Sequence, residues 1–141
     1  MSYESLPRFL AKIDLFDGLP AETLSDLIGR GTTFKTPAGA SVVQQGGDDS
    51  GLQVVLEGSA EVTVNGEARP ALGVGDYFGE ISLLDGQPRS ASVAAGPDGL
   101  TTFVLSSLAF APVVKENSEV AQTLLKALCG RIRSLEAADK A

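Results

Sequence analysis

Apolar residues follow different spacings along the chain, and each spacing predicts a different kind of element. Near the N-terminus they recur at mostly helical intervals, and Pro7 suits the first turn of a helix. After a turn signal at residues 17–20, a second helical run over residues 21–29 closes at two glycines. The pattern therefore predicts two short helices within residues 4–30.

From Thr32 the spacing becomes alternating, which is typical of strands. Short runs rich in Val, Leu or Thr predict strands at residues 41–45, 52–56, 60–64, 68–72, 90–95 and 100–105. Turn signals separate them at residues 36–39, 46–51, 57–59, 65–66 and 73–75. Strict alternation places Ala60, Val62 and Val64 on the core face, and the Asn-Gly pair at 65–66 suits a type I′ hairpin turn. Several short strands at this spacing predict a sandwich or barrel over residues 32–105.

Helical spacing returns after residue 105. Ser106 and Ser107 offer a helix cap, and Pro112 is expected to interrupt the helix that follows. Asn117 and Ser118 are expected to cap a long final helix, so that C-terminal helices cover about residues 106–138. Its apolar residues lie three and four positions apart and predict one buried face, made by Val120, Leu124, Leu128, Ile132 and Leu135.

The candidate chemistry lies in residues 73–93. The spacing of Phe78, Ile81, Leu83 and Leu84 predicts a short amphipathic turn of helix that begins at Gly79. A glycine there leaves backbone amides uncovered at the positive end of the helix, where an anion binds readily. Glu80 stands at that helix start, and Arg89 and Ser90 follow the next turn. A carboxylate accepts hydrogen bonds from hydroxyls and an arginine forks onto phosphate oxygens, so the stretch predicts a site for a ligand with both a diol and a phosphate. The alternative is a surface ion pair between Glu80 and Arg89, worth about 0–1 kcal/mol.

Residues 78–93 read Phe-Gly-Glu-Ile-Ser-Leu-Leu, then Asp-Gly-Gln-Pro, then Arg-Ser-Ala-Ser-Val. The stretch closely resembles the phosphate-binding cassette of cyclic nucleotide-binding domains, the family of catabolite activator proteins, kinase regulatory subunits and gated channels. Residues 15–24 are similar to the usual entry to these domains. The resemblance implies a mainly β fold with flanking helices (α+β): an antiparallel jelly-roll β-roll with N-terminal helices and a C-terminal lid helix.

The resemblance also implies residue roles. Glu80 would hold the ribose 2′-hydroxyl and Arg89 the cyclic phosphate, and Gly79, Ser82 and Ser90 would complete the cradle. Counting along the final helix puts Arg131 near Glu80, and Leu135 and Glu136 near the base. The expected ligand-binding set is Phe78, Gly79, Glu80, Ile81, Ser82, Arg89, Ser90, Ala91, Arg131 and Leu135. The expected ligand is cAMP, with cGMP as the alternative.

Composition narrows the remaining classes of function. The 141 residues suit one domain, and a net charge of −7 argues against direct nucleic-acid binding. The chain has no histidine, which removes histidine-based acid–base and nucleophilic catalysis and imidazole metal sites. We therefore expect a sensor and not an enzyme, with no metal or other cofactor. Cys129 is the single cysteine, and no apolar run is long enough to cross a bilayer, so a cytoplasmic location without membrane contact is expected.

Several alternatives stay open. The domain is expected to act alone, on an unknown protein effector or through a homodimer, or else to be the excised sensor of a larger transcription factor or enzyme. A cupin-like barrel enzyme would lack the usual histidine metal ligands. The last alternative is a β-roll that binds a protein partner and no nucleotide.

Overall fold

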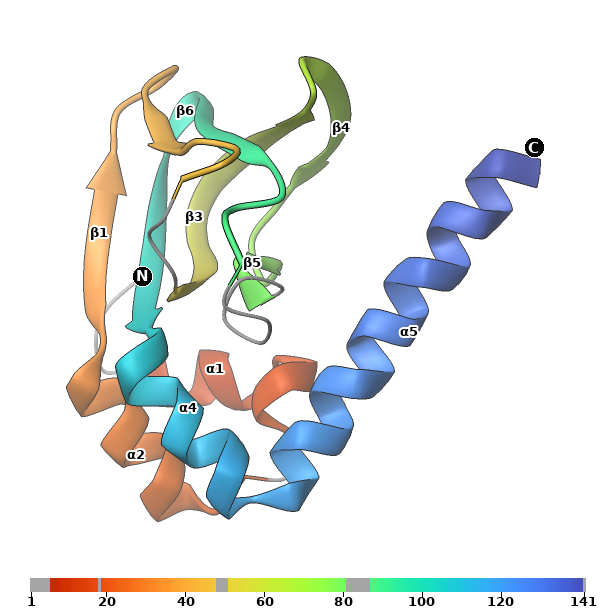
Figure 1. The fold of residues 1–141 in the computed structure, drawn as a ribbon. Coiled ribbons are helices and arrows are strands. Elements are labelled where there is room, and N and C mark those ends of the chain that lie inside the picture. The colour runs from red at the N-terminus through yellow and green to blue at the C-terminus, as the bar shows by residue number, and fades with distance from the viewer. Residues whose placement is uncertain (1–5, 18, 48–50, 81–86, 141) are drawn as a thin grey trace.

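The computed structural model describes residues 6–17, 19–47, 51–80 and 87–140, with only the backbone described at Leu135 and residues 138–140. The helices are α1 (Leu6–Ala11), η2 (Asp14–Phe16), α2 (Ala21–Arg30), α4 (Ser107–Glu116) and α5 (Ser118–Lys140). The strands are β1 (Thr32–Thr36), β2 (Ser41–Val43), β3 (Gly51–Val64), β4 (Glu67–Leu72), β5 (Tyr77–Phe78) and β6 (Ser92–Ser106). Figure 1 shows the curled strands above α1, α2 and α4, with α5 leaving this group at an angle.

All the strand pairs are antiparallel, and two long strands organise them. β3 and β6 pair along most of their length, β1 and β2 lie on the other edge of β6, and β4 and β5 pair with β3. This arrangement confirms the predicted antiparallel β-roll with N-terminal helices. The predicted hairpin at 65–66 is also confirmed, because Asn65 and Gly66 both have the positive φ angles (53° and 81°) that a type I′ turn requires.

The strand boundaries differ from the prediction in one instructive way. The turn expected at residues 57–59 is a bulge inside β3, with the β3–β6 register shifting on both sides of Gly58. Gly58 has φ 79°, and a Cβ there would collide with the carbonyl oxygen of Gly99 on β6. Glycine therefore allows the strand to bend and continue without breaking, and the runs 90–95 and 100–105 are likewise joined in β6. β1 and the two-residue β5 were not predicted as strands.

The side chains of β3 alternate between two hydrophobic cores. The helix-side core lies between the roll and the helices and includes Leu10, Phe16, Leu52, Val54, Phe103 and Phe110. The roll core lies on the other face and consists of Val43, Val55, Ala60, Phe78, Val93, Ala95 and Leu100. Val62 packs against the roll core, as the strand pattern predicted. The roll core is the apolar surface next to the predicted site.

The helix expected to break at Pro112 is continuous. Ser106 caps α4 by accepting a hydrogen bond from the Ala109 amide, as predicted, but Pro112 lies within the helix. Proline cannot donate to the carbonyl four residues earlier, which here belongs to Leu108. Leu108 is almost fully exposed, so water can satisfy that carbonyl and the helix tolerates the proline.

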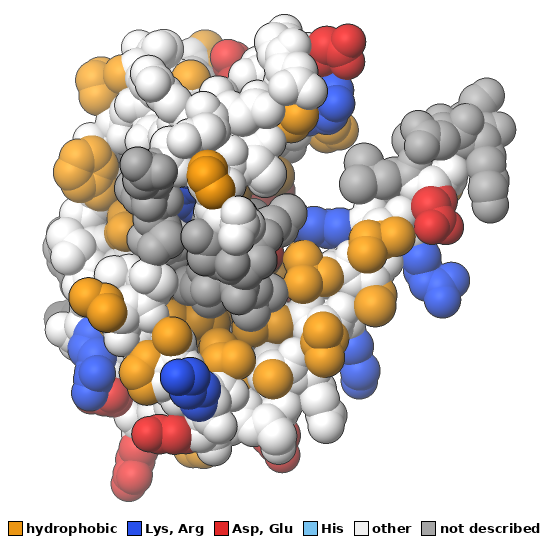
Figure 2. Space-filling view, in the orientation of Figure 1, with side chains coloured by type: hydrophobic (Ala, Val, Ile, Leu, Met, Phe, Trp, Pro, Cys, Tyr) orange, Lys and Arg blue, Asp and Glu red, His pale blue; other side chains and the backbone are white. Residues whose placement is uncertain are grey.

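The first turns of α5 are packed, but the later turns are not. Val120 and Leu124 are buried in the helix-side core, whereas Leu125 is 62% exposed and Ile132 is 55% exposed. The predicted burial of one face from Val120 to Leu135 is therefore wrong at Ile132, and the Leu135 side chain lies outside the described residues. The physical reason is that α5 diverges from the roll beyond its first turns (Figure 1), so apolar side chains follow one another along its surface in Figure 2.

Candidate functional site

The predicted cassette begins where β5 ends. Phe78 is buried in the roll core, Gly79 turns the chain with φ 95°, and Glu80 is in helical conformation. The rest of the predicted short helix, with Ile81, Ser82, Leu83 and Leu84, lies outside the described residues. The description resumes at Gln87, so the two charged residues of the motif, Glu80 and Arg89, can both be placed.

Glu80 is a buried acid whose two oxygens differ in their contacts. The residue is 1% exposed, and its Oε1 lies 2.5 Å from Nη1 of Arg131. Its Oε2 is also buried and has no hydrogen-bond partner in the described part of the chain. Burial raises the pKa of this carboxyl above its ordinary value, and the charges of Arg131 and Arg89 oppose that rise. A surface ion pair is therefore the wrong interpretation of Glu80.

Arg89 is held at both its backbone and its side chain. Its amide donates to the Gly47 carbonyl at 2.9 Å, and its carbonyl accepts from the Gly46 amide at 2.8 Å. Its Nη1 donates to the Gly51 carbonyl at 3.0 Å, and the residue is 6% exposed. The backbone of Gly46, Gly47 and Gly51 thus fixes the position and the direction of the guanidinium.

The glycine of the motif is explained by the packing around Arg89. A Cβ at Gly79 would collide with the Gly51 carbonyl oxygen and would lie 2.5 Å from Nη1 of Arg89. The carbonyl that binds Arg89 therefore sits directly against residue 79. Only glycine combines this close approach with the positive φ.

Arg131 joins α5 to the site, as the count along the final helix predicted. Besides Glu80, its guanidinium contacts Tyr77, donating from Nη2 to the Tyr77 carbonyl at 3.0 Å. Its Cζ lies 5.7 Å from the centre of the Tyr77 ring, within the range of a cation–π interaction. Tyr77 was not among the site residues predicted from the sequence. An aromatic residue beside the motif with a polar hydroxyl was the signal available.

Tyr77 also faces the N-terminal helices. Burial, together with the charge and hydrogen bond of Asp14 on η2, raises the pKa of the Tyr77 phenol well above its ordinary value. The phenol is therefore neutral across the physiological range. Tyr77 thus lies between η2 on one side and Arg131 of α5 on the other.

The remaining predicted site residues differ in exposure. Ser90 is exposed beside Arg89, and Ala91 is half-buried. Near them, the backbone amide of Gln45 donates to Ser92 Oγ. The Gln45 side chain donates from Nε2 to Asn65 Oδ1 and accepts at Oε1 from the Asn65 backbone amide, at the tip of the β3–β4 hairpin. These bonds tie the hairpin to the segment that holds Arg89.

The arrangement offers a buried acceptor and a buried cation beside an apolar core. Such a set suits a ligand with a hydroxyl donor, an anionic group and an apolar ring. Among the described Asp, Glu and Cys residues, no three cluster closely enough to hold a metal ion. None of the helices traced in the structure is long and apolar enough to span a membrane.

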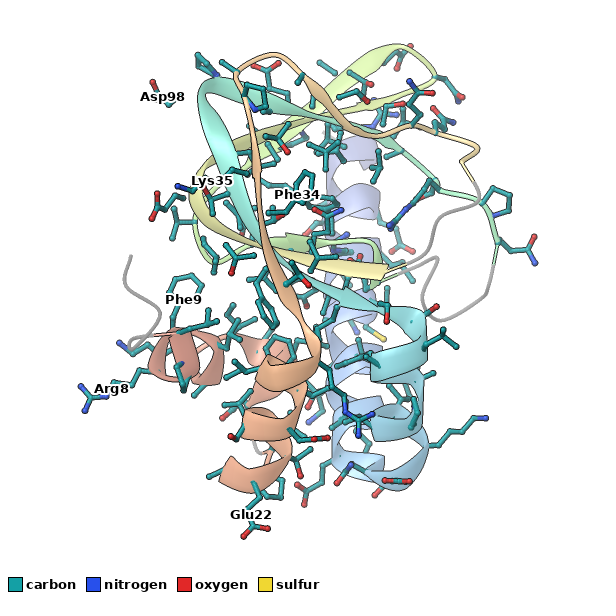
Figure 3. All side chains as sticks on the ribbon, turned by 90° about the vertical axis from the view of Figure 1, so that its left-hand side faces the viewer. Arg8, Phe9, Glu22, Phe34, Lys35 and Asp98 are labelled. Carbon is teal, nitrogen blue, oxygen red and sulfur yellow. The ribbon has the colours of Figure 1, made fainter. Side chains whose placement is uncertain are left out.

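A hollow lies elsewhere on the roll, away from the cassette. It has a volume of about 360 Å³ and is lined by residues of β1 and β2, including Phe34 and Lys35. Figure 3 shows these two side chains on opposite sides of β1. Neither Glu80 nor Arg89 lines the hollow, and Lys35 is the one charged residue among its described lining. The buried Glu80 and Arg89 therefore distinguish the cassette from this hollow.

The chain is similar to known proteins in both sequence and fold. The sequence model of the family described as "Cyclic nucleotide-binding domain" matches residues 33–117. The chain is 34% identical, over 89 residues, to a cAMP-dependent protein kinase regulatory subunit of Emericella nidulans. The matched region covers 62% of this chain and 22% of the relative. The chain thus spans about a fifth of that relative's length.

Two crystal structures share the fold. The catabolite activator protein of Thermus thermophilus matches with a TM-score of 0.77 and 27% identity, over 90% of this chain and 62% of that one. The regulatory domain of Toxoplasma gondii PKA, crystallised with cAMP, matches with a TM-score of 0.77 and 26% identity, over 88% of this chain and 49% of that one.

Proposed function

Because the chain belongs to the cyclic nucleotide-binding domain family, we propose that its ligand is cAMP, bound between Glu80 and Arg89, and that α5 responds to its binding. The domain is regulatory, as the family is.

The observation that carries the proposal is the buried Glu80 oxygen, Oε2, that has no hydrogen-bond partner among the described residues. A buried carboxylate oxygen without a hydrogen bond is costly, so a protein that keeps one gains from a ligand that supplies a donor. A ribose 2′-hydroxyl is such a donor. Arg131 already occupies Oε1, so Oε2 is the atom that we assign to the ribose.

Arg89 supplies the opposite charge. A guanidinium carries five N–H donors in a planar fork that matches phosphate oxygens, and the Gly51 carbonyl fixes its orientation. The roll core, with Phe78 and Val62 packed in or against it, provides an apolar neighbourhood for the rest of the nucleotide. We assign the cyclic phosphate to Arg89 and the exposed Ser90 beside it.

The choice of cAMP over cGMP rests on the similar proteins. The kinase subunit in the comparison is named as cAMP-dependent, and the Toxoplasma domain was crystallised with cAMP. A guanine edge would need a polar partner, and Ser90 is the candidate next to the cassette arginine. We therefore propose a preference for cAMP, with Ser90→Ala as the variant that would reduce any affinity for cGMP.

The response of α5 follows from the Arg131–Glu80 ion pair. Ligand bound at Oε2 changes the environment of the carboxylate that holds Arg131, and the exposed apolar side chains of α5 offer a surface that can close over the base. Because Arg131 is already attached, the turns of α5 beyond it would be the part that moves, and shifting those turns from mostly open to mostly closed takes about 5.5 kcal/mol of differential affinity. The signal would pass to a separate protein or to a second copy of the chain, in the cytoplasm, where the exposed Cys129 would stay reduced.

Calorimetric titration of nucleotide-stripped protein with cAMP, cGMP and 2′-deoxy-cAMP tests the proposal. We expect cAMP to bind most tightly and the 2′-deoxy ligand to lose affinity, because it lacks the donor for Oε2. A ligand at about 100 times its dissociation constant should also raise the free energy of unfolding by about 2.7 kcal/mol. Binding of neither cyclic nucleotide would refute the proposed ligand, and equal binding of the 2′-deoxy ligand would refute the role of Glu80.

A further inference from the structure

The later half of α5 is attached to the roll through Arg131. In the described part of the chain, the hydrogen bonds and ion pairs that join this half of α5 to the roll all belong to that residue. The neighbouring Ile132, Arg133 and Ser134 are exposed. The Arg131 side chain is itself 43% exposed, so solvent competes for its guanidinium unless the roll holds it firmly.

Two of the three Arg131 contacts go to Tyr77 and not to Glu80. The Tyr77 carbonyl accepts from Nη2, and the face of the Tyr77 ring lies under the guanidinium carbon. Glu80 accepts from Nη1. The two ends of the planar fork therefore bind two different residues of the same short segment, and the ring sets the plane of the fork.

Tyr77 is well placed to act as a rigid support. It is buried in the helix-side core and pairs with Val54 in the β3–β5 ladder. Its hydroxyl is engaged by Asp14 of η2, and burial with that acid keeps the phenol neutral. A support fixed by a strand, a core and a helix loses little conformational freedom when Arg131 docks on it.

We infer that Tyr77 is a positioning residue that holds Arg131, and with it the later half of α5, against Glu80 before any ligand is present. The effect of Tyr77 on nucleotide affinity rests on the function proposed for Glu80. Its role in attaching α5 to the roll is independent of that function. The docked Arg131 supplies the counter-charge of Glu80 and leaves Oε2 for the ligand.

The position of α5 can be measured without nucleotide. Cys129 is the single cysteine, is exposed, and lies two residues from Arg131, so it accepts a spin label without further change. A second label at Glu61→Cys, an exposed position of β3, gives a pulsed-EPR distance between α5 and the roll. We expect a narrow distance distribution in the parent and in Tyr77→Phe, which keeps the ring, and a broad one in Tyr77→Leu.

A double-mutant cycle separates positioning from general stability. Tyr77→Leu should broaden the distribution in the parent but add nothing in an Arg131→Gln background, because the residue acts through Arg131. If Tyr77→Leu does not fold, Arg131→Lys replaces it, since an ammonium cannot hold Glu80 and the Tyr77 carbonyl with one planar fork. That variant should also give a broad distribution.

Nucleotide affinity gives the second readout. Tyr77→Leu should weaken cAMP binding about two- to thirtyfold, the range that a cation–π contact supports, with no further loss when Arg131 is already Gln. An unchanged distance distribution in Tyr77→Leu, or in Arg131→Lys where that variant is used, overturns the inference. A Tyr77→Phe distribution as broad as that of Tyr77→Leu overturns the role of the ring. If no cyclic nucleotide binds at all, the proposed function fails while the distances still decide the attachment of α5.

Discussion

Gly79 lies so close to Arg89 that a methyl group at residue 79 would lie 2.5 Å from the guanidinium and would collide with the Gly51 carbonyl that orients it. The smallest residue of the motif thus permits the contact that directs its largest one. Gly75, four residues earlier, has nearly the same φ (93° against 95°), but a Cβ there would meet nothing within 4 Å. The two glycines form a matched pair in which only one supports the site.

We therefore expect Gly79→Ala to cost more than Gly75→Ala. Both pay the strain of an L-residue at positive φ, about 1–2 kcal/mol, and Gly79→Ala adds an overpacking cost of about 1–3 kcal/mol. Urea unfolding measures the difference in the free energy of unfolding. Titration with cAMP should show a loss of affinity in Gly79→Ala alone, and equal losses in both variants would mean that residue 79 does not shape the phosphate site.

Arg89→Lys should weaken cAMP binding about tenfold to a hundredfold, since a charge-assisted hydrogen bond is worth about 1.5–3 kcal/mol and lysine cannot form the bidentate fork. The fold should survive, because the backbone of residue 89 keeps both hydrogen bonds to Gly46 and Gly47. Calorimetry gives the affinity and circular dichroism the fold. The exposed Arg69→Lys serves as control and should bind like the parent. Parental affinity in Arg89→Lys would place the phosphate elsewhere.

Glu80 should make the free protein less stable as pH rises. Burial raises its pKa, and an acid with a raised pKa in the folded state gives its full stability below its ordinary pKa of 4.5 and loses it as pH rises through the raised value. The neutral isostere Glu80→Gln avoids this loss, so its melting temperature should gain on that of the parent from pH 4.5 until the pH has passed the raised pKa, and the difference should then stay constant. The same variant should bind cAMP more weakly.

The exposed Glu61→Gln is the control for this pH series, and its melting curve should follow the parent at each pH. If Glu80→Gln is less stable than the parent at neutral pH, the ion pair with Arg131 outweighs the cost of burial.

The two neighbouring leucines of α5 should respond oppositely to truncation. Leu124 is 2% exposed and Leu125 is 62% exposed. Leu124→Ala should lower the free energy of unfolding by about 2–5 kcal/mol, and Leu125→Ala should change it by no more than about 0.5 kcal/mol. Chemical denaturation at several protein concentrations provides the measurement. A large, concentration-dependent loss in Leu125→Ala would show that a second copy covers this face of α5.

Tyr77 should ionise only far above the ordinary tyrosine pKa of about 10. The chain has two tyrosines, Tyr3 and Tyr77, and no tryptophan, so a Tyr3→Phe variant reports Tyr77 alone in an absorbance titration at alkaline pH. Asp14→Asn should lower the Tyr77 pKa, because the acid contributes charge and a hydrogen bond to its elevation. An ordinary titration in a folded Tyr3→Phe protein would contradict the buried contact with Asp14.

The sequence predicted correctly those features of the fold that depend on neighbouring residues alone. Asn65 and Gly66 specify their turn from their own backbone preferences, and Ser106 caps the helix next to it. Gly58 and Pro112 misled the prediction because their outcome depends on distant partners. Gly58 is read as a bulge only once Gly99 lies opposite, and Pro112 is tolerated because the residue four positions earlier faces solvent.

In the site too, the residue types could be predicted from the sequence, but the contacts between distant segments could not. The types and spacing of Gly79, Glu80 and Arg89 indicated the chemistry, and family resemblance brought Arg131 to Glu80. Spacing could not show that the Gly51 carbonyl directs Arg89, or that Tyr77 supports Arg131, because these contacts join segments 38 and 54 residues apart. The exposure of the later half of α5 could not be predicted from the spacing of its apolar residues either. An apolar stripe shows that a face prefers burial, but it does not show what covers that face.

The pairing of β1 with β6 has a consequence for how the chain is made. Thr36 lies opposite Leu100, so the edge of β1 is covered only after β6 has been synthesised. During synthesis β3 leaves the ribosome well ahead of β6, its main partner. Until β6 arrives, β5 is the only one of the described strands that pairs with the apolar segment of β3 around Val54, because β4 pairs with the far end of β3. A nascent chain stalled before β6 would expose an open strand edge, the form most prone to aggregation. We expect this domain to acquire its nucleotide site only late in translation, in a single closing step that joins both sides of the roll.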